Sequence, residues 1–250
     1  MSDPHRSEVA HLGLPEETRA CLFDLDGVLI QTLPLHKKAW KETFDPLLAG
    51  AGQPPFTDED YLRHVDGKRR ADGVRDFLAS RGLEYPEGEP DDEPGNDTIA
   101  GIGNRKNELV LDVMENEGVQ TYDGSVRFLR LARDTGLAIG VVTASANGER
   151  ALETAGLAEL VDVRIDGVVA ARDELRGKPA PDTFLAGAEA LGVEPAHAVV
   201  FEDALSGVEA GRAGGFAMVI GVDRGDNGEG LKEHGADVVV TDLAQLLDDR

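Results

Sequence analysis

Two carboxylates that follow a short apolar run are the first feature of the chain that suggests chemistry. Ala20–Phe23 is apolar and has the length of a buried strand, and Asp24 and Asp26 follow it, before a glycine. Alternate residues of an extended segment point the same way, so both acids can face one reacting group. Buried acids are costly unless a cation neutralises them, and Mg²⁺ favours carboxylates and phosphate-bearing substrates. The alternative is a solvated Asp-Gly turn.

A second apolar run also ends in two acids. Val199-Val200-Phe201 leads directly into Glu202 and Asp203. In an open α/β sheet, ligands bind beyond the carboxyl ends of the strands, so two strands that end in acids indicate one site. Asp24 and Asp203, with Glu202 as a further candidate, can together hold a hard cation. The alternative is two unrelated acidic turns in an acid-rich protein.

A third apolar run leads into small polar residues that can bind an anion. Residues 138–142 are apolar and precede Thr143-Ala144-Ser145-Ala146-Asn147. The hydroxyls, the amide and the N–H groups of a helix that begins there can donate to a phosphate. The candidates for phosphate binding are therefore Thr143, Ala144, Ser145 and Asn147. The alternative is ordinary N-capping by Ser145 or Asn147.

Lys178 is the candidate cation for the same phosphate. It lies in Gly177-Lys178-Pro179-Ala180-Pro181, where two prolines stiffen the backbone before an expected helix. The ammonium group can thus be held in one place beside an anion. A solvated surface lysine is the alternative.

Composition limits the classes of function. The chain has 250 residues with 25 Lys and Arg against 48 Asp and Glu, so the formal net charge is 25 − 48 = −23, which argues against binding to nucleic acid or to anionic membranes. The polar N-terminal stretch does not resemble a signal peptide, and no apolar run is long enough to span a bilayer. The single cysteine, Cys21, lies inside the first apolar run, as a buried residue in a reducing compartment would. We expect a cytoplasmic protein.

The order of the expected elements predicts two domains. Residues 1–17 read as a loose lead-in, and residues 33–118 read as mostly helical, with helices expected over 57–65 and 104–116 and a surface loop at 84–98. From residue 119 onward, apolar strands alternate with helices and end in a helix at 243–247, a pattern typical of a doubly wound parallel sheet. The prediction is a Rossmann-like α/β core of residues 1–32 and 119–250 with a helical cap domain of residues 33–118 inserted after the first strand.

Four segments in this order resemble the motifs of the haloacid dehalogenase superfamily. They are Phe-Asp-Leu-Asp-Gly-Val-Leu, Thr143 after a strand, Gly-Lys-Pro-Ala-Pro-Asp and Phe-Glu-Asp-Ala-Leu-Ser-Gly, and the match covers nearly the whole chain from Ala20. The resemblance implies that Asp24 is the nucleophile and forms an aspartyl phosphate, and that Asp26 is the general acid and base. It implies Mg²⁺ held by Asp24, the Asp26 carbonyl, Asp203 and Glu202. Thr143, Ser145 and Lys178 would bind the transferring phosphoryl group.

Within that superfamily the chain most resembles the β-phosphoglucomutases. The cap carries this finer likeness, in Leu-His-Lys-Lys-Ala-Trp with His36 and Trp40, in Gly67 followed by Arg70, and in Arg-Lys-Asn with Lys106. The resemblance implies that Arg70 binds the phosphate distal to the reaction, while His36 and Lys106 position the sugar and help the cap close. The alternatives are a satisfied histidine and solvated cations.

The implied reaction interconverts β-D-glucose 1-phosphate and glucose 6-phosphate through glucose 1,6-bisphosphate. The partner would be a small-molecule sugar phosphate, and we expect a monomer. A sugar-phosphate phosphatase with the same two aspartates is the alternative, and a non-catalytic sugar-phosphate-binding protein is a third hypothesis. The chain departs from the family at Gln31, where many members have Asp, and at Ala146, where some have Lys.

Overall fold

The computed structural model describes residues 9–225 and 227–247, which divide into two compact units. The boundaries fall between Gln31 and Thr32 and between Val119 and Gln120, each one residue from the division expected from the sequence. We call the unit that holds the first strand the core and the unit from Thr32 to Val119 the cap. Within the described residues, no helix combines the length and the apolar character that a membrane crossing needs.

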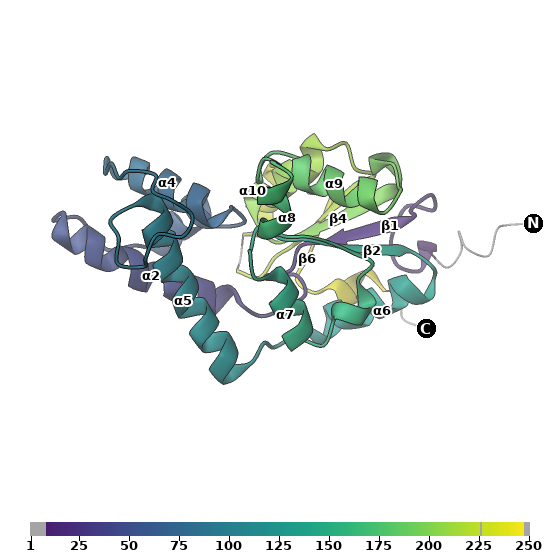
Figure 1. Ribbon diagram of the computed structural model, residues 1–250. Helices are drawn as coiled ribbons and strands as arrows, with labels where there is room; N and C mark the ends of the chain where they lie inside the picture. The colour runs from purple at the N-terminus through teal and green to yellow at the C-terminus, as the bar shows by residue number, and fades with distance from the viewer. Residues whose placement is uncertain (1–8, 226, 248–250) are drawn as a thin grey trace, which may run out of the picture. The chain divides into compact units, whose positions relative to one another are not determined.

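The core is built on one six-stranded sheet in which every pairing is parallel (Figure 1). The strand order is β3-β2-β1-β4-β5-β6, so the strand that precedes Asp24 lies in the middle. The strands are β1 (Ala20–Phe23), β2 (Ala138–Val142), β3 (Val163–Ile165), β4 (Ala198–Glu202), β5 (Met218–Val222) and β6 (Val238–Val240). This confirms the predicted Rossmann-like parallel sheet.

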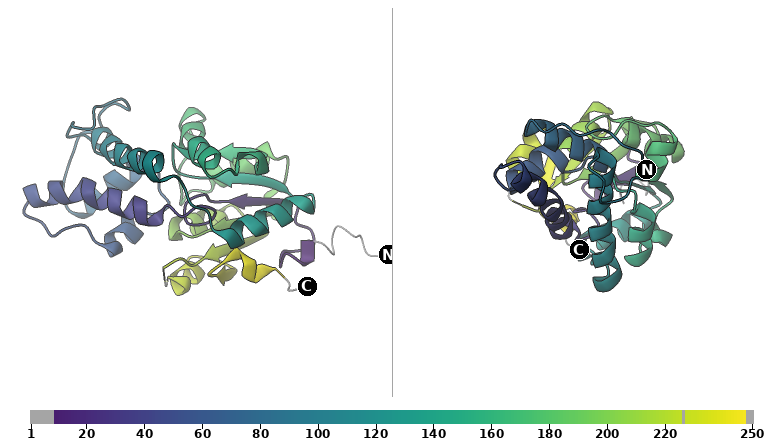
Figure 2. Two further views of the ribbon diagram at one scale, coloured as in Figure 1. Left: turned by 90° about the horizontal axis from the view of Figure 1, so that it is seen from below. Right: turned by 60° about the vertical axis from the view of Figure 1, so that its left-hand side comes forward.

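Helices connect the strands and cover both faces of the sheet. They are α6 (Asp123–Asp134), α7 (Gly148–Thr154), α8 (Gly167–Arg172), α9 (Asp182–Ala190), α10 (Leu205–Ala213) and α11 (Gly228–Glu233), with short 3₁₀ turns η2 (Ala158–Leu160), η3 (Pro195–His197) and η4 (Leu243–Leu246). In Figures 1 and 2, α9 and α10 lie on one face of the sheet and α6 on the other.

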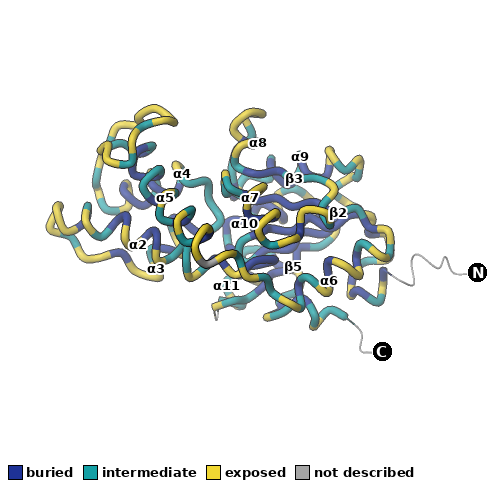
Figure 3. The backbone as a smooth tube through the Cα atoms, turned by 60° about the horizontal axis from the view of Figure 1, so that its bottom comes forward, coloured by how far each residue is buried: buried dark blue, intermediate teal, exposed yellow. Residues whose placement is uncertain are grey.

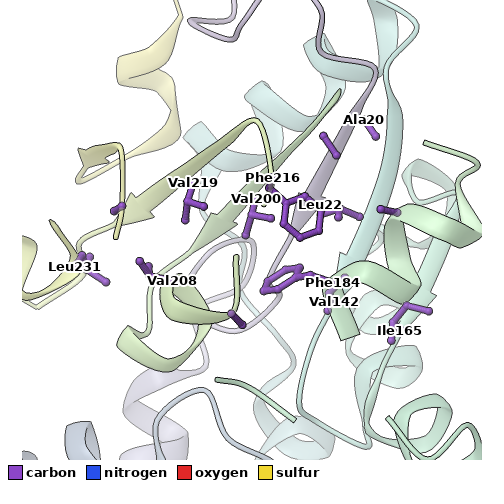
Figure 4. Close-up of a cluster of buried hydrophobic side chains, with 14 residues drawn as sticks. Ala20, Leu22, Val142, Ile165, Phe184, Val200, Val208, Phe216, Val219 and Leu231 are labelled. Carbon is purple, nitrogen blue, oxygen red and sulfur yellow. The ribbon is translucent and has the colours of Figure 1, made fainter. Parts of the chain in front are cut away.

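Alternation along β1 explains how both faces are filled. Leu22 packs with Phe184 of α9 and Val200 of β4 in the cluster drawn in Figure 4. The next residue, Phe23, stacks on Phe201 at 4.4 Å between ring centroids and meets Phe128 of α6 edge-on on the opposite face. The central strands β1 and β4 are therefore fully buried, in keeping with the dark blue interior of the core in Figure 3, and they form a rigid base for the residues at their ends.

The cap contains helices and loops, with no strand among its described residues. Its helices are α2 (Leu33–Gly50), α3 (Asp58–Asp60), a π-helical turn η1 (Tyr61–Val65), α4 (Arg70–Ser80) and α5 (Ile99–Glu117). They enclose a hydrophobic core of their own, in which Phe44 stacks on Trp40 at 5.1 Å and meets Phe77 at 4.3 Å. A separate core explains why this segment forms its own unit.

Two ends of the chain differ from the sequence prediction. Residues 9–17 are not a loose lead-in, because Val9, Leu12 and Leu14 are buried, and Gly13 packs against the backbone of Leu246. Residues 1–8 of that prediction lie outside the described part. The helix expected over 243–247 is only the 3₁₀ turn η4, which Asp242 begins by accepting a hydrogen bond from the Ala244 amide.

Three helices also differ. The helix expected over 57–65 is the short α3 followed by η1, and an unpredicted helix, α8, follows β3 after Asp166 caps it. Helix α5 starts at Ile99 rather than near residue 104, because the Thr98 hydroxyl accepts a hydrogen bond from the Gly101 amide at 2.9 Å. Two glycines in its first turns, Gly101 and Gly103, hide this start in the sequence.

Candidate active site

The polar residues predicted from the sequence come from the ends of three neighbouring strands. Phe23 of β1 is in register with Val141 of β2 and with Phe201 of β4. Asp24, Thr143 and Glu202 follow these positions by one or two residues and therefore lie at one edge of the sheet. In the strand order, β2 lies on one side of β1 and β4 on the other, so the direction of winding reverses at β1. Doubly wound sheets bind their ligands beyond the carboxyl ends of the strands at such a point.

A buried ammonium group links two of these strand ends. Lys178 Nζ lies 2.5 Å from Asp24 Oδ1, 2.5 Å from Glu202 Oε1 and 3.2 Å from the Val142 carbonyl oxygen. The side chains of Lys178, Asp24 and Glu202 are only 2%, 9% and 0% exposed. The solvated-lysine alternative is therefore wrong, since Lys178 is the counter-ion of two carboxylates. Its ammonium group also lies 4.8 Å from the centre of the Phe184 ring.

Glu202 can enter the interior because of the glycine that faces it. A Cβ atom on Gly207 would lie 1.8 Å from Glu202 Oε1, so only glycine leaves room for the carboxylate there. The second carboxylate oxygen accepts a hydrogen bond from the Ala204 amide at 2.8 Å. Both oxygens are thus occupied inside the protein, and the sequence reasoning did not foresee that Glu202 is the partner of Lys178.

The charges of this cluster do not balance. Burial raises the pKa of Asp24, the Glu202 and Asp26 carboxylates raise it further, and Lys178 opposes them. Burial alone would lower the pKa of Lys178, but the Asp24 and Glu202 carboxylates raise it. Two carboxylates thus share one ammonium group and Asp26 adds a further negative charge beside Asp24, so the cluster can accept a further cation.

The segment after β2 forms the next wall of the site. The Thr143 side chain is buried, with its hydroxyl 3.5 Å from Asp26 Oδ2. The Thr143 hydroxyl also accepts a hydrogen bond from the Ser145 amide, and the Ser145 hydroxyl accepts one from the Asn147 amide, each at 3.1 Å. Asn147 stands at the N-cap position of α7 but makes no capping hydrogen bond with its side chain. Gly167 packs closely against the Ala144 carbonyl oxygen on the other side of this turn.

Among the described residues, no three His, Cys, Asp or Glu side chains gather closely enough to bind a metal by themselves. Mg²⁺ usually needs only one or two protein carboxylates, with water and substrate oxygens completing its shell. The excess negative charge around Asp24 fits such an ion. Asp203, the other predicted ligand, directly follows β4 at the same edge.

The cap, taken by itself, brings its own predicted residues together in two groups. Lys106 Nζ lies 2.7 Å from His36 Nδ1 and 5.0 Å from the centre of the Trp40 ring. Because an ammonium group can only donate, Nδ1 must be the acceptor and the His36 proton lies on Nε2. His36 can therefore donate a hydrogen bond from Nε2.

The second group follows Gly67, whose positive φ of 67° forms the turn before α4. Of the three cations after it, Lys68 pairs with Asp76 at 2.5 Å and Arg69 with Asp72 at 2.9 Å. Arg70 instead donates to the Asn104 side-chain oxygen at 2.9 Å. Asn104 was not singled out from the sequence.

Comparison with known proteins agrees with this architecture. The family model for haloacid dehalogenase-like hydrolases matches residues 18–215. The β-phosphoglucomutase of Mycobacterium bovis is 52% identical over 246 residues, which cover 94% of this chain and 94% of that protein. The validoxylamine A 7′-phosphate phosphatase of Streptomyces hygroscopicus subsp. limoneus is 30% identical over 91% of this chain and 95% of that protein. The solved β-phosphoglucomutase structure from Clostridium difficile shares the fold, with a TM-score of 0.74 and 24% identity over 92% of this chain and 93% of that one.

Proposed function

Because the chain belongs to the haloacid dehalogenase-like hydrolase family, we propose that its buried Asp24 is a phosphoryl-accepting nucleophile and that the protein is a β-phosphoglucomutase. It interconverts β-D-glucose 1-phosphate and glucose 6-phosphate through glucose 1,6-bisphosphate. The observation that carries this proposal is the contact of Lys178 with Asp24 and Glu202 at the edge of the sheet. The full-length similarity to the mycobacterial enzyme supports the choice of sugar phosphate.

The first half-reaction transfers a phosphoryl group to the enzyme. An oxygen of Asp24 attacks the phosphorus atom of the bisphosphate, the bond between phosphorus and the sugar oxygen breaks, and the leaving oxygen receives a proton from Asp26. Glucose 6-phosphate then leaves and β-glucose 1-phosphate enters. In the second half-reaction Asp26 takes the proton from its 6-hydroxyl, whose oxygen attacks the phosphorus atom of the aspartyl phosphate, and the bond to Asp24 breaks, which regenerates the bisphosphate. The position of Asp26 beside the Thr143 hydroxyl supports its role next to the reacting group.

Electrostatic stabilisation of the transferred group comes from the residues around Asp24. Lys178 offsets the negative charge of the nucleophile, while the Thr143 and Ser145 side chains and the backbone from Ala144 to Asn147 bind phosphoryl oxygens. Asp24, the Asp26 carbonyl and Asp203 would hold Mg²⁺, with Glu202 acting through Lys178 rather than as a principal ligand. Bound Mg²⁺ supplies charge that reduces repulsion between the carboxylate and the phosphate.

The cap supplies the features that a mutase needs beyond a phosphatase. A bisphosphate has a second phosphate to hold while the first one reacts, and Arg70 is the cap cation that we assign to it. His36 and Lys106 contribute an N–H donor and a positive charge for sugar hydroxyls or phosphate oxygens, and Trp40 packs beside them. A site that holds a phosphate at each end accepts the bisphosphate in either orientation, so either phosphate can be presented to Asp24.

The deciding experiment follows two products in one reaction. The protein is mixed with β-glucose 1-phosphate, Mg²⁺ and a trace of glucose 1,6-bisphosphate, and glucose 6-phosphate and free phosphate are measured together. Glucose 6-phosphate without matching phosphate release is the expected result. Phosphate release alone would place the protein with phosphatases such as its validoxylamine relative. An Asp24→Asn variant is the control, because a non-catalytic binding protein would show no turnover in either form.

A further inference from the structure

Arg70 differs from its neighbours in having a neutral partner. Lys68 and Arg69 are each neutralised by a carboxylate of α4. Among the described residues, the only hydrogen bond of the Arg70 guanidinium is the one to Asn104 Oδ1, and it has no carboxylate within ion-pair distance. A guanidinium group has five N–H donors, so this contact orients it and leaves both its charge and most of its donors for an anion.

The amide of Asn104 is itself fixed in one orientation. Its nitrogen donates to the Pro90 carbonyl oxygen at 3.1 Å and to the Asp92 carbonyl oxygen at 2.9 Å. Because both N–H groups are used, the amide oxygen must face Arg70. Asn104 therefore joins Arg70 to the acidic loop of residues 84–98, for which the sequence suggested no role.

That loop is held in place by contacts of its own. The Asp92 carboxylate accepts hydrogen bonds from the Thr98 hydroxyl at 2.6 Å and from the Glu89 amide at 3.2 Å. The Arg105 guanidinium donates to the Pro94 carbonyl oxygen at 2.9 Å. The backbone oxygens that hold Asn104 thus belong to an ordered turn.

Two glycines of α5 make room for this arrangement. A Cβ atom on Gly101 would lie 2.5 Å from the Asn96 carbonyl oxygen, so the loop packs directly against the helix there. A Cβ atom on Gly103 would lie 3.2 Å from Cγ and 3.4 Å from Nε of Arg70. The Arg70 side chain therefore lies across the helix surface at Gly103, next to Asn104.

We propose that Asn104 is a positioning residue which, together with Gly103 and the loop of residues 84–98, sets how tightly Arg70 binds the second phosphate of a sugar bisphosphate. This rests on the proposed function, in which Arg70 holds the distal phosphate. Asn104, Gly103 and the loop affect the selectivity for bisphosphates and not the chemistry at Asp24.

The test compares Arg70→Ala, Asn104→Ala and the double variant, with Asn116→Ala as a matched control at an exposed site on the same helix. The KM for glucose 1,6-bisphosphate should rise about tenfold or more in Asn104→Ala, since a hydrogen bond to a charged group is lost. The kcat and the rate of Asp24 phosphorylation by acetyl phosphate, which has no second phosphate, should stay close to wild type. The double variant should match Arg70→Ala, because Asn104 acts through Arg70.

Two further variants separate positioning from mere stability. Asn104→Asp keeps the oxygen but loses both N–H donors and neutralises Arg70, so KM should rise at least as much as in Asn104→Ala. Gly103→Ala should raise KM without lowering the melting temperature, because alanine favours the helix while its methyl group displaces Arg70.

The outcomes distinguish this inference from the proposed function. If Arg70→Ala leaves the KM for the bisphosphate unchanged, the assignment of the distal phosphate to Arg70 is wrong, and the inference fails with it. If Arg70→Ala raises KM but Asn104→Ala does not, or if the two effects simply add, the inference alone is wrong. An equal loss of acetyl phosphate reactivity in Asn104→Ala would show general damage to the fold and would also overturn it.

Discussion

Replacing Lys178 with methionine tests the electrostatic account of the site. Methionine keeps an unbranched apolar chain of similar length but removes the ammonium group that contacts Asp24 and Glu202. The two carboxylates then remain in a buried place without their cation. Both the stability of the core and the rate of phosphoryl transfer should fall.

The size of the loss follows from the burial of each group. Removing one partner of a buried ion pair costs about 3–5 kcal/mol. Asp24, whose side chain is 9% exposed, recovers some contact with water, whereas Glu202 is 0% exposed and keeps only the Ala204 amide. At about 2–4 °C of melting temperature per kcal/mol for a chain of this size, Lys178→Met should lower the melting temperature by about 6–20 °C. The kcat should fall by about 10²–10³ because a fixed donor is lost from the transition state.

The stability loss should depend on pH in a defined direction. Without Lys178, burial and the neighbouring Glu202 and Asp26 carboxylates raise the pKa of Asp24 in the folded state further above its value in the unfolded chain. The folded variant then holds protons that the unfolded chain releases, so its free energy of unfolding falls as pH rises from the ordinary carboxyl pKa through the raised one. The deficit relative to wild type should be largest near neutral pH and shrink toward acid.

Thermal and urea unfolding at about pH 8 and about pH 5 measure this deficit. Lys232→Met serves as the control, because Lys232 is exposed on α11 in the same unit and should change stability by no more than about 0.5 kcal/mol. A Lys178→Met protein that melts like the control at about pH 8, or whose deficit grows toward about pH 5, would refute the assignment of Lys178 as the counter-ion.

Three further predictions follow from other contacts. Gly207→Ala should destabilise the core by about 1–3 kcal/mol in urea unfolding, because the added methyl group collides with Glu202, whereas Gly225→Ala, with nothing within 4 Å, should not. Arg224→Ala should lower both stability and kcat, since the guanidinium donates at 2.8 Å to the Gly27 carbonyl oxygen in the turn after Asp26, and Arg224→Lys should not restore them because lysine lacks the planar fork. Chelation with EDTA should abolish turnover, and added Mg²⁺ should restore it; full activity in EDTA would contradict the proposed metal.

Much of the core and of its site could be predicted from local sequence. The apolar runs that became β1, β2 and β4 are short and continuous, and each ends in the polar residues that mark its carboxyl end. Since parallel strands end at a common edge, Asp24, Thr143 and Glu202 could be brought together without coordinates. The helical insertion after the first strand was equally visible, because its apolar residues recur at helical spacing.

The partners of these residues could not be predicted, because they depend on tertiary contacts. The sequence does not show that the Glu202 carboxylate turns inward to Lys178, because Lys178 is distant along the chain and the room that Gly207 leaves becomes apparent only in the fold. Likewise, the start of α5 depends on the Thr98 cap, and its glycines are explained only by the loop and the side chain that pack on them. Helix propensity alone predicts that those glycines disfavour a helix.

Tertiary partners also explain how a protein with a net charge of −23 can bind an anionic substrate. An acidic surplus neutralises cations at random positions, as Lys68 and Arg69 show by pairing with carboxylates of α4, the helix that follows them. Of the three cations after Gly67, only the one with a neutral partner keeps its charge for a phosphate. Arg70 has such a partner in Asn104, whose amide nitrogen donates to the Pro90 and Asp92 carbonyl oxygens of the acidic loop. On our proposal, binding of the distal phosphate depends on the identity of this one hydrogen-bond acceptor, which neither the net charge nor the run of three cations could reveal.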